Sequence, residues 1–255
     1  MLVAITRKIS PRMSECQLTH LARAPIDVKR AAAQHQAYED CLEGLGCRVT
    51  SLPAEPELPD SVFVEDVAVV FDELAILARP GAESRRAEVA SVAKALEPHR
   101  KLERIEAPGT LDGGDVLTAG KQVFVGLSQR TNQAGIKQMR ALLAPHGYKV
   151  ESVPVERCLH LKSAVTQVAE RTLLINPAWL DRRPFGNFEL VEVDSAEPFA
   201  ANALLLNGAV IFSAAYTRTG KRLEERGIRV IPVEVSELAK AEGGVTCCSL
   251  IFSPK

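Results

Sequence analysis

A repeated unit runs along most of the chain. Each copy has an apolar run typical of a strand, a polar turn, and a second apolar run that ends in small residues. The copies begin at Phe63, Leu111, Leu159, Ala200 and Gly243, so successive starts lie 48, 48, 41 and 43 residues apart. A period in this range indicates repetition around an axis or along a solenoid.

The segments between the copies favour a closed ring over a solenoid. We expect helices to fill these gaps, since residues 83–99 and 130–147, for example, have apolar residues at the three-to-four spacing of helices. A solenoid needs polar capping repeats, whereas five units of mixed strand and helix fit a ring better. We therefore predict an α/β propeller in which residues 1–255 form a single domain. The last copy ends with the chain, so we expect residues 2–5 and 49–52 to complete its blade.

Charge and composition restrict the kind of partner. The 255 residues carry 31 Lys and Arg against 32 Asp and Glu, a formal net charge of -1. No overall field would attract nucleic acid or an anionic membrane, so we expect a small-molecule partner, with monomer and homodimer both open. The first 16 residues resemble neither a signal peptide nor a membrane span, and the six cysteines form no CxxC pair. We therefore expect a cytoplasmic protein with reduced thiols.

Polar residues recur near the start of each copy, where equivalent positions in a ring converge on its axis. We call them the mouth residues: Glu65, Asp66, Asp112, His160, Asn202 and Cys247. Taken singly, Cys247 reads as a small core residue and His160 as a hydrogen-bonded structural histidine. Asp112 reads as a turn residue, with Gly113 and Gly114 supplying positive φ angles. As a set in one register, carboxylates, an imidazole and a thiol instead indicate a site.

The two adjacent carboxylates need charge partners. Glu65 and Asp66 interrupt what reads as an apolar strand, and an uncompensated buried charge is costly, so they must meet a cation. Asp60 is a turn residue or a ligand, and Arg85 and Arg130 stand where solvated arginine is common, so spacing alone leaves their roles open.

The paired cysteines supply at most one nucleophile. Cys247 and Cys248 are adjacent in what reads as a strand. Because successive strand residues face opposite sides, one of the two is expected to face the axis and the other the packing.

At these residues the chain resembles the dimethylarginine dimethylaminohydrolases of the guanidine-modifying superfamily, whose fold is a five-bladed ββαβ propeller. The matching segments are PDSVFVEDVAVV, RPGAESRR, LDGGDVL, FVGLSQRTNQAG, LHLKS and GGVTCCSLIF, in this order and spread over nearly the whole chain. The resemblance implies hydrolysis of methylated arginines to citrulline and a methylated amine, without a metal or organic cofactor. Cys247 matches the nucleophile, His160 the general acid/base, and Asp112 the carboxylate that orients the histidine.

The resemblance also implies a substrate site. Asp66 matches the ligand of the guanidinium nitrogens, with Glu65 beside it. Arg85 and Arg130 match the pair that grips the α-carboxylate. Asp60 and the backbone carbonyl of Leu18 match the α-amino site, and residues 15–20 match a lid loop.

One departure from the family concerns the substrate side chain. The family usually has Asp where this chain has Glu242, and an apolar β-branched residue where it has Ala241. The resemblance implies that both lie near the guanidinium, where the extra methylene would affect how methyl groups fit.

Three rival interpretations remain open. An enzyme of the same superfamily could act on arginine, related amines or citrulline. A non-catalytic propeller could use the charges at its mouth to bind a partner, although such a protein has no need of both Cys247 and His160. These two residues could also bind zinc, but two ligands make a weak site.

Overall fold

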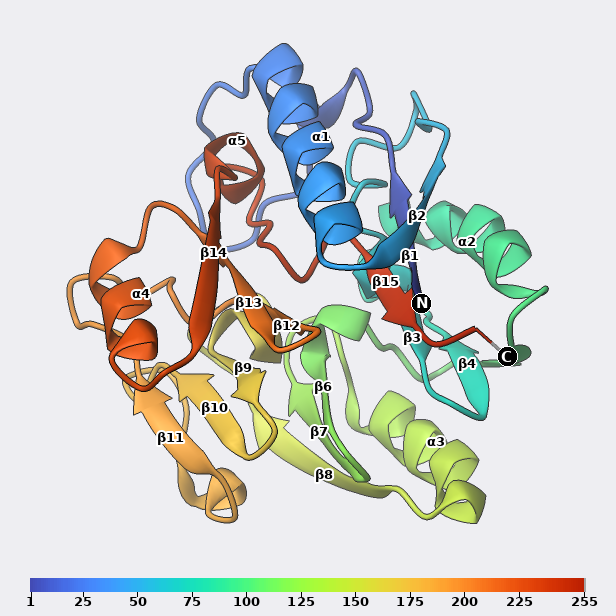
Figure 1. Cartoon of the computed structure of the whole chain (residues 1–255). Helices are drawn as coiled ribbons and strands as arrows, with labels where there is room; N and C mark the ends of the chain where they lie inside the picture. The colour runs from blue at the N-terminus through green and yellow to red at the C-terminus, as the bar shows by residue number, and fades with distance from the viewer. Residues whose placement is uncertain (255) are drawn as a thin grey trace.

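The computed structural model describes residues 1–254, which form five small sheets of three strands each. The sheets are arranged around a central axis, with most helices on the outside (Figure 1). Each blade has a first strand antiparallel to the second, which is parallel to the third. A parallel pair needs a crossover connection, and a helix supplies it in four of the five blades. The predicted five-bladed α/β propeller is confirmed.

The elements follow the predicted repeat closely. The first blade contains β3 (Ala68–Val70), β4 (Leu74–Leu77), α2 (Val89–Leu96) and β5 (Lys101–Arg104), and the second contains β6 (Val116–Ala119), β7 (Gln122–Leu127), α3 (Gln133–Leu143) and β8 (Lys149–Pro154). The third blade contains β9 (Val165–Ala169), β10 (Thr172–Ile175) and β11 (Glu189–Glu192), and the fourth contains β12 (Ala203–Leu206), β13 (Ala209–Ser213), α4 (Thr217–Glu224) and β14 (Arg229–Val233). The fifth blade contains β15 (Leu250–Phe252), β1 (Leu2–Arg7), α1 (Val28–Gly44) and β2 (Cys47–Leu52). The short helix α5 (Ser236–Ala239) precedes the last blade. The expectation that helices fill every gap is wrong at the third blade, where β10 and β11 are joined through a single 3-10 turn, η7 (Arg183–Phe185).

The two ends of the chain close the ring. Strand β1 pairs antiparallel with β15, for example Val3 with Phe252, and parallel with β2. This arrangement confirms the expected completion of the last blade by residues 2–5 and 49–52. An apolar cluster then joins it to the first blade, with Ile5 and Leu250 in the same cluster as Val67 and Leu77. Both termini lie close together in Figure 1.

The first strands of all five blades line the ring's centre. A channel of about 250 Å³ has walls from β3, β6, β9, β12 and β15. The segments just before these strands therefore converge at one end of the channel. Within residues 1–254, no helix is long and apolar enough to cross a membrane.

Candidate active site

The mouth residues lie on the turns that lead into the first strands, not on the strands. Glu65 and Asp66 are in the 3-10 helix η2 (Val64–Val67), Asp112 precedes η4 (Gly113–Asp115), and His160 precedes η6 (Leu161–Ser163). The interpretation of 64–67 as part of a strand is therefore wrong. At the entrances of the first three blades, a 3-10 turn presents polar side chains to the axis while the following strand stays apolar.

Cys247 belongs to a turn that ends before β15 begins at Leu250. Strand alternation therefore does not distinguish it from Cys248, and that step of the prediction is wrong. The turn itself separates them: Cys247 borders two cavities, whereas Cys248 is 1% exposed inside an apolar cluster. The amide of Gly244 donates to Cys247 Sγ at 3.4 Å.

His160 is buried between two carboxylates. Its Nε2 lies 3.0 Å from Asp112 Oδ2, and its Nδ1 lies 3.7 Å from Asp66 Oδ1. Burial opposes the imidazolium, but Asp66, the hydrogen bond with Asp112 and the nearby Asp115 outweigh it and raise the pKa of His160 to about 9. The imidazole is therefore protonated at neutral pH in the unliganded protein.

The thiol of Cys247, in contrast, is kept in its neutral form. Burial, followed by the charges of Glu65 and Asp66, raises the pKa of Cys247 to about 12. The unliganded site thus holds a neutral thiol beside a protonated imidazole. Any added positive charge near the sulfur would favour the thiolate.

Two glycines let the histidine approach the carboxylates. A Cβ on Gly114 would lie 2.5 Å from His160 Nδ1, and one on Gly113 would lie 1.9 Å from the Glu65 carbonyl oxygen. Neither glycine is among the residues with positive φ, so the prediction that they supply such angles is wrong. They are required because backbone and side chains pass too close for any larger residue.

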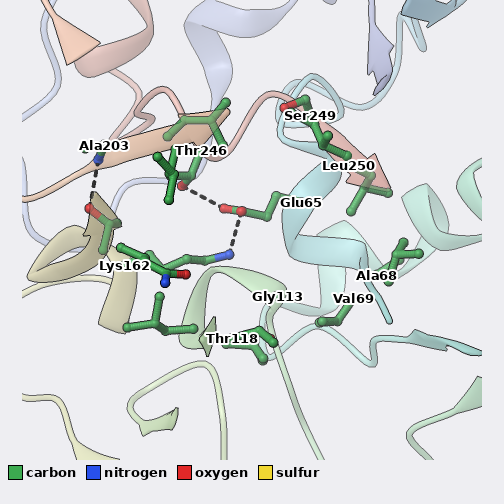
Figure 2. Close-up of a pocket in the computed structure, with 18 residues that line it drawn as sticks. Glu65, Ala68, Val69, Gly113, Thr118, Lys162, Ala203, Thr246, Ser249 and Leu250 are labelled. Carbon is green, nitrogen blue, oxygen red and sulfur yellow. Dashed lines mark hydrogen bonds and ion pairs between the residues drawn. The ribbon is translucent and has the colours of Figure 1, made fainter. Parts of the chain in front are cut away.

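Glu65 forms the boundary between the mouth and the channel. Lys162 Nζ donates to its Oε1 at 2.5 Å, and Thr246 Oγ1 donates to its Oε2 at 2.8 Å, as Figure 2 shows. Asn202 holds Thr246 through its side-chain amide, and the Glu65 amide donates to the Cys247 carbonyl. Burial raises the pKa of Glu65 to about 7, against the opposing effect of Lys162. The network ties the turn that contains Cys247 to η2.

The cation that pairs with Asp66 is a side chain of the protein itself. Arg85 Nη1 donates to Asp66 Oδ2 at 2.5 Å, and the rest of that guanidinium bonds to both oxygens of Glu88 and to the carbonyls of Asp60 and Phe63. Burial opposes the charged carboxylate, but His160 and Arg85 outweigh it and lower the pKa of Asp66. The predicted need for a cation is confirmed, with Arg85 supplying it for Asp66 and Lys162 for Glu65.

The remaining predicted ligands surround a small cavity of about 20 Å³. Asp60, Asp66, Arg85, Arg130, His160, Ala241, Glu242 and Cys247 all line it, together with Gln17. Leu18 is half-buried against an apolar cluster. The structure therefore brings most of the predicted substrate site together around one space.

Residues 17–21 cover this small cavity. The amide of Gln17 donates to the Asp60 carboxylate at 3.1 Å, and Arg130 Nη2 donates to Thr19 Oγ1 at 2.9 Å. Glu242, expected near the guanidinium, directs its carboxylate to backbone amides of this segment instead. A larger cavity of about 400 Å³, which Cys247, Phe199 and Tyr216 also line, lies beside it.

Three buried carboxyl and imidazole groups have a spacing that could suit a metal. Ligand atoms of Asp66, Asp112 and His160 lie within 4.8 Å of one another. However, Asp66 is paired with Arg85, and Asp112 lies 3.8 Å from Arg130 Nη1. A cation here would have to displace or repel two guanidinium groups, so the set fits proton transfer better than metal binding.

The sequence reasoning missed three residues that support the site. Lys162 pairs with Glu65, Glu88 pairs with Arg85, and Asp115 accepts from the Leu161 amide next to the histidine. Asp115 is fully buried, and burial raises its pKa to about 6. Because Glu65 was expected to need a cation, Lys162, which lies only two residues after His160, could have been predicted as its partner.

A ring of five β-rich blades with a cysteine, a histidine and paired carboxylates at one mouth defines the class: a cysteine hydrolase of the guanidine-modifying, or pentein, superfamily. Residues 19–252 match the family model described as N,N dimethylarginine dimethylhydrolase, eukaryotic. A dimethylarginine dimethylaminohydrolase of Pseudomonas aeruginosa is 39% identical over 236 residues, which cover 92% of each chain. The chain therefore belongs to the dimethylarginine dimethylaminohydrolase family.

Two solved structures are similar over nearly the whole chain. A cysteine-to-serine mutant of the Pseudomonas aeruginosa enzyme in complex with citrulline is 37% identical, with a TM-score of 0.94 and 98% of both chains covered. A dimethylarginine dimethylaminohydrolase with a histidine-to-glycine change, in adduct with S-methyl-L-thiocitrulline, is also 37% identical. Its TM-score is 0.93, with 99% of this chain and 100% of that chain covered.

Proposed function

We propose that the protein hydrolyses asymmetric dimethylarginine and monomethylarginine to citrulline and dimethylamine or methylamine, through a covalent thiouronium on Cys247. The observation that carries the proposal is the placement of His160, held between Asp112 and Asp66, on the same small cavity as Cys247. The related citrulline complex and thiocitrulline adduct support the same chemistry.

The first half of the reaction forms the covalent intermediate. A guanidinium is a resonance-stabilised cation and a poor electrophile, so it needs a soft thiolate. Its own positive charge beside Sγ opposes the effect of Glu65 and Asp66 and favours loss of the thiol proton to water. Sγ then adds to the guanidinium carbon, protonated His160 donates to the departing amine, and the C–N bond breaks to leave the thiouronium.

The second half releases citrulline. His160, now neutral, removes a proton from water as the water oxygen adds to the thiouronium carbon. The adduct's hydroxyl oxygen becomes the carbonyl of citrulline as the C–S bond breaks; the sulfur leaves as thiolate and the hydroxyl proton passes to water. Asp112 stabilises the imidazolium that forms again. This route uses side chains alone as nucleophile and proton carrier, so it needs no metal or organic cofactor.

The amino-acid end of the substrate would be held by the charges around the small cavity. Arg130 and Arg85 suit an α-carboxylate, and Asp60 suits an α-ammonium group, for which the Leu18 carbonyl would be a further ligand. Burial, opposed by Arg85, raises the pKa of Asp60, so an ammonium group there would favour its charged form. Such a site selects a zwitterion with a cationic tail. We propose that the protein works on this small molecule in the cytoplasm, as a monomer or homodimer.

The test compares substrates and traps the intermediate. The protein is incubated separately with asymmetric dimethylarginine, monomethylarginine, arginine and citrulline, and dimethylamine, methylamine and ammonia are quantified. We expect dimethylamine and methylamine, with a mass increase on a Cys247 peptide after rapid acid quench, and neither signal from C247S. A higher kcat/KM for release of ammonia from arginine or citrulline would instead identify a deiminase or citrullinase. A C247S variant as active as the parent would refute the mechanism.

A further inference from the structure

The small cavity is closed in this structure. Its volume of about 20 Å³ is little more than the space of one water molecule, although it contains the ligands of a whole amino acid. Gln17 forms part of its wall, and Asp60 and Arg130 are bonded to Gln17 and Thr19. A substrate of the proposed kind can enter only if residues 17–21 move away.

One carboxylate holds that segment in place. Glu242 Oε2 accepts from the Thr19 amide at 2.9 Å, and Oε1 accepts from the amides of His20 and Leu21 at 2.5 and 2.6 Å. Three backbone donors on one ionised acceptor make a strong local contact, because hydrogen bonds to charged groups are the stronger kind. The contact joins positions more than 220 residues apart in the chain.

Glu242 adopts an uncommon backbone conformation to make this contact. Its φ is 58°, in the left-handed region that non-glycine residues avoid. Glycine would fit this conformation without strain, so the glutamate is present in spite of its backbone preference. The three amide contacts explain what its side chain contributes there.

We propose that Glu242 is a positioning residue, the latch of a lid formed by residues 17–21. With the latch closed, Thr19 and Gln17 are hydrogen-bonded to Arg130 and Asp60, and Glu242 lies where the small cavity meets the larger one, which His20 and Leu21 also line. Substrate entry and product exit require release of the three amides. The assignment rests on the proposed function for its ligand, but the latch itself is a property of the unliganded protein.

Hydrogen exchange of the unliganded protein tests the latch directly. In E242Q, the amide group keeps the size of the side chain but loses the charge, so exchange in the peptide that contains residues 19–21 should rise about 10- to 100-fold. E242D keeps the charge and should stay within a few-fold of the parent. E242G removes the carboxylate and the backbone strain, so the peptide should lose protection while the Tm is maintained or rises.

Glu197 offers a matched control. Its carboxylate accepts from the amides of Arg218 and Thr219 at 3.0 and 2.8 Å, in another blade. E197Q should increase exchange near residues 217–219 and leave residues 19–21 unchanged. Unchanged protection of residues 19–21 in E242Q and E242G would overturn the latch.

Citrulline exchange separates a latch from a substrate contact. The latch stabilises the closed state with and without ligand, so its loss in E242Q should leave the Kd for citrulline nearly unchanged. The association and dissociation rates, measured by NMR exchange with labelled citrulline, should both rise about 10- to 100-fold. A Kd raised tenfold or more with unchanged rates would overturn the latch and make Glu242 a substrate contact. If the parent protein binds no citrulline, the proposed function fails, while hydrogen exchange still decides the latch.

Discussion

Replacing Asp112 by asparagine should move the titration of His160. The change removes a negative charge 3.0 Å from Nε2 and leaves a side chain of the same shape. A hydrogen bond to a charged partner contributes roughly 1.5–3 kcal/mol, and 1.36 kcal/mol corresponds to one pH unit. The pKa of His160, raised to about 9 in the parent, should therefore fall to about 7–8 in D112N.

Two measurements detect this change in the pKa of His160. The histidine carbon or nitrogen resonance of isotopically labelled protein gives the midpoint directly, and the alkaline limb of kcat should move down with it, because amine departure needs the imidazolium. D181N, an Asp-to-Asn change at a half-exposed carboxylate, serves as the control and should leave the midpoint alone. A His160 midpoint that stays near the parent value in D112N would refute the role given to Asp112.

The same group predicts how stability depends on pH. The folded pKa of His160 is raised from 6.5 to about 9, so its contribution is complete below pH 6.5 and lost as pH rises through about 9. The interval corresponds to about 3 kcal/mol. Urea unfolding at pH 6 and pH 9.5 should show this loss in the parent, and a smaller loss in D112N. Equal pH dependence in the two proteins would contradict the assignment.

Three further changes test other parts of the site. C247S should abolish turnover, whereas C248S, at a core position away from the cavities, should keep a substantial fraction of kcat; equal inactivation of two folded variants would contradict this. D66N should lose most of its affinity for arginine analogues while circular dichroism shows an unchanged fold, and unchanged affinity would make Asp66 structural. Thiolate absorbance of Cys247 should titrate near pH 12 in the free protein and at lower pH with a non-reactive, cationic arginine analogue bound; a midpoint that does not fall would refute activation by substrate.

The fold could be predicted because the repeated pattern of strands, turns and helices is visible in short segments of the sequence. Alternation of apolar and polar residues, turn residues and helical spacing recur in every copy, so the blades and even the joined termini followed from the sequence. The third blade was less predictable, since the crossover before β11 contains only a short 3-10 turn. Residues 64–67 and 245–248 were misread as strands because a short apolar run fits a buried turn equally well.

The sequence predicted which residues form the site but not which of them pair with one another. Register placed Glu65, Asp66, Asp112, His160 and Cys247 at one mouth, and the family resemblance supplied their roles. The partners were chosen by distant parts of the chain: Lys162 meets Glu65 across 97 positions, and Glu242 meets His20 across 222. The spacing of residues within a short segment does not indicate such long-range contacts, so only the structure shows them.

The charges around Cys247 also suggest how the site distinguishes substrate from product. Burial, together with the charges of Glu65 and Asp66, raises the pKa of Cys247 and holds the thiol protonated, and the partners Lys162 and Arg85 are already bonded to the two carboxylates. A cationic guanidinium is the additional positive charge that favours the thiolate, whereas citrulline carries a neutral urea in the same place. In the proposed mechanism the sulfur leaves the second tetrahedral adduct as thiolate, and the neutral urea adds no positive charge beside it, so burial and the two carboxylates again favour the protonated thiol. Reaction of the thiolate with the product is thereby disfavoured, because only a cationic ligand renews the nucleophile.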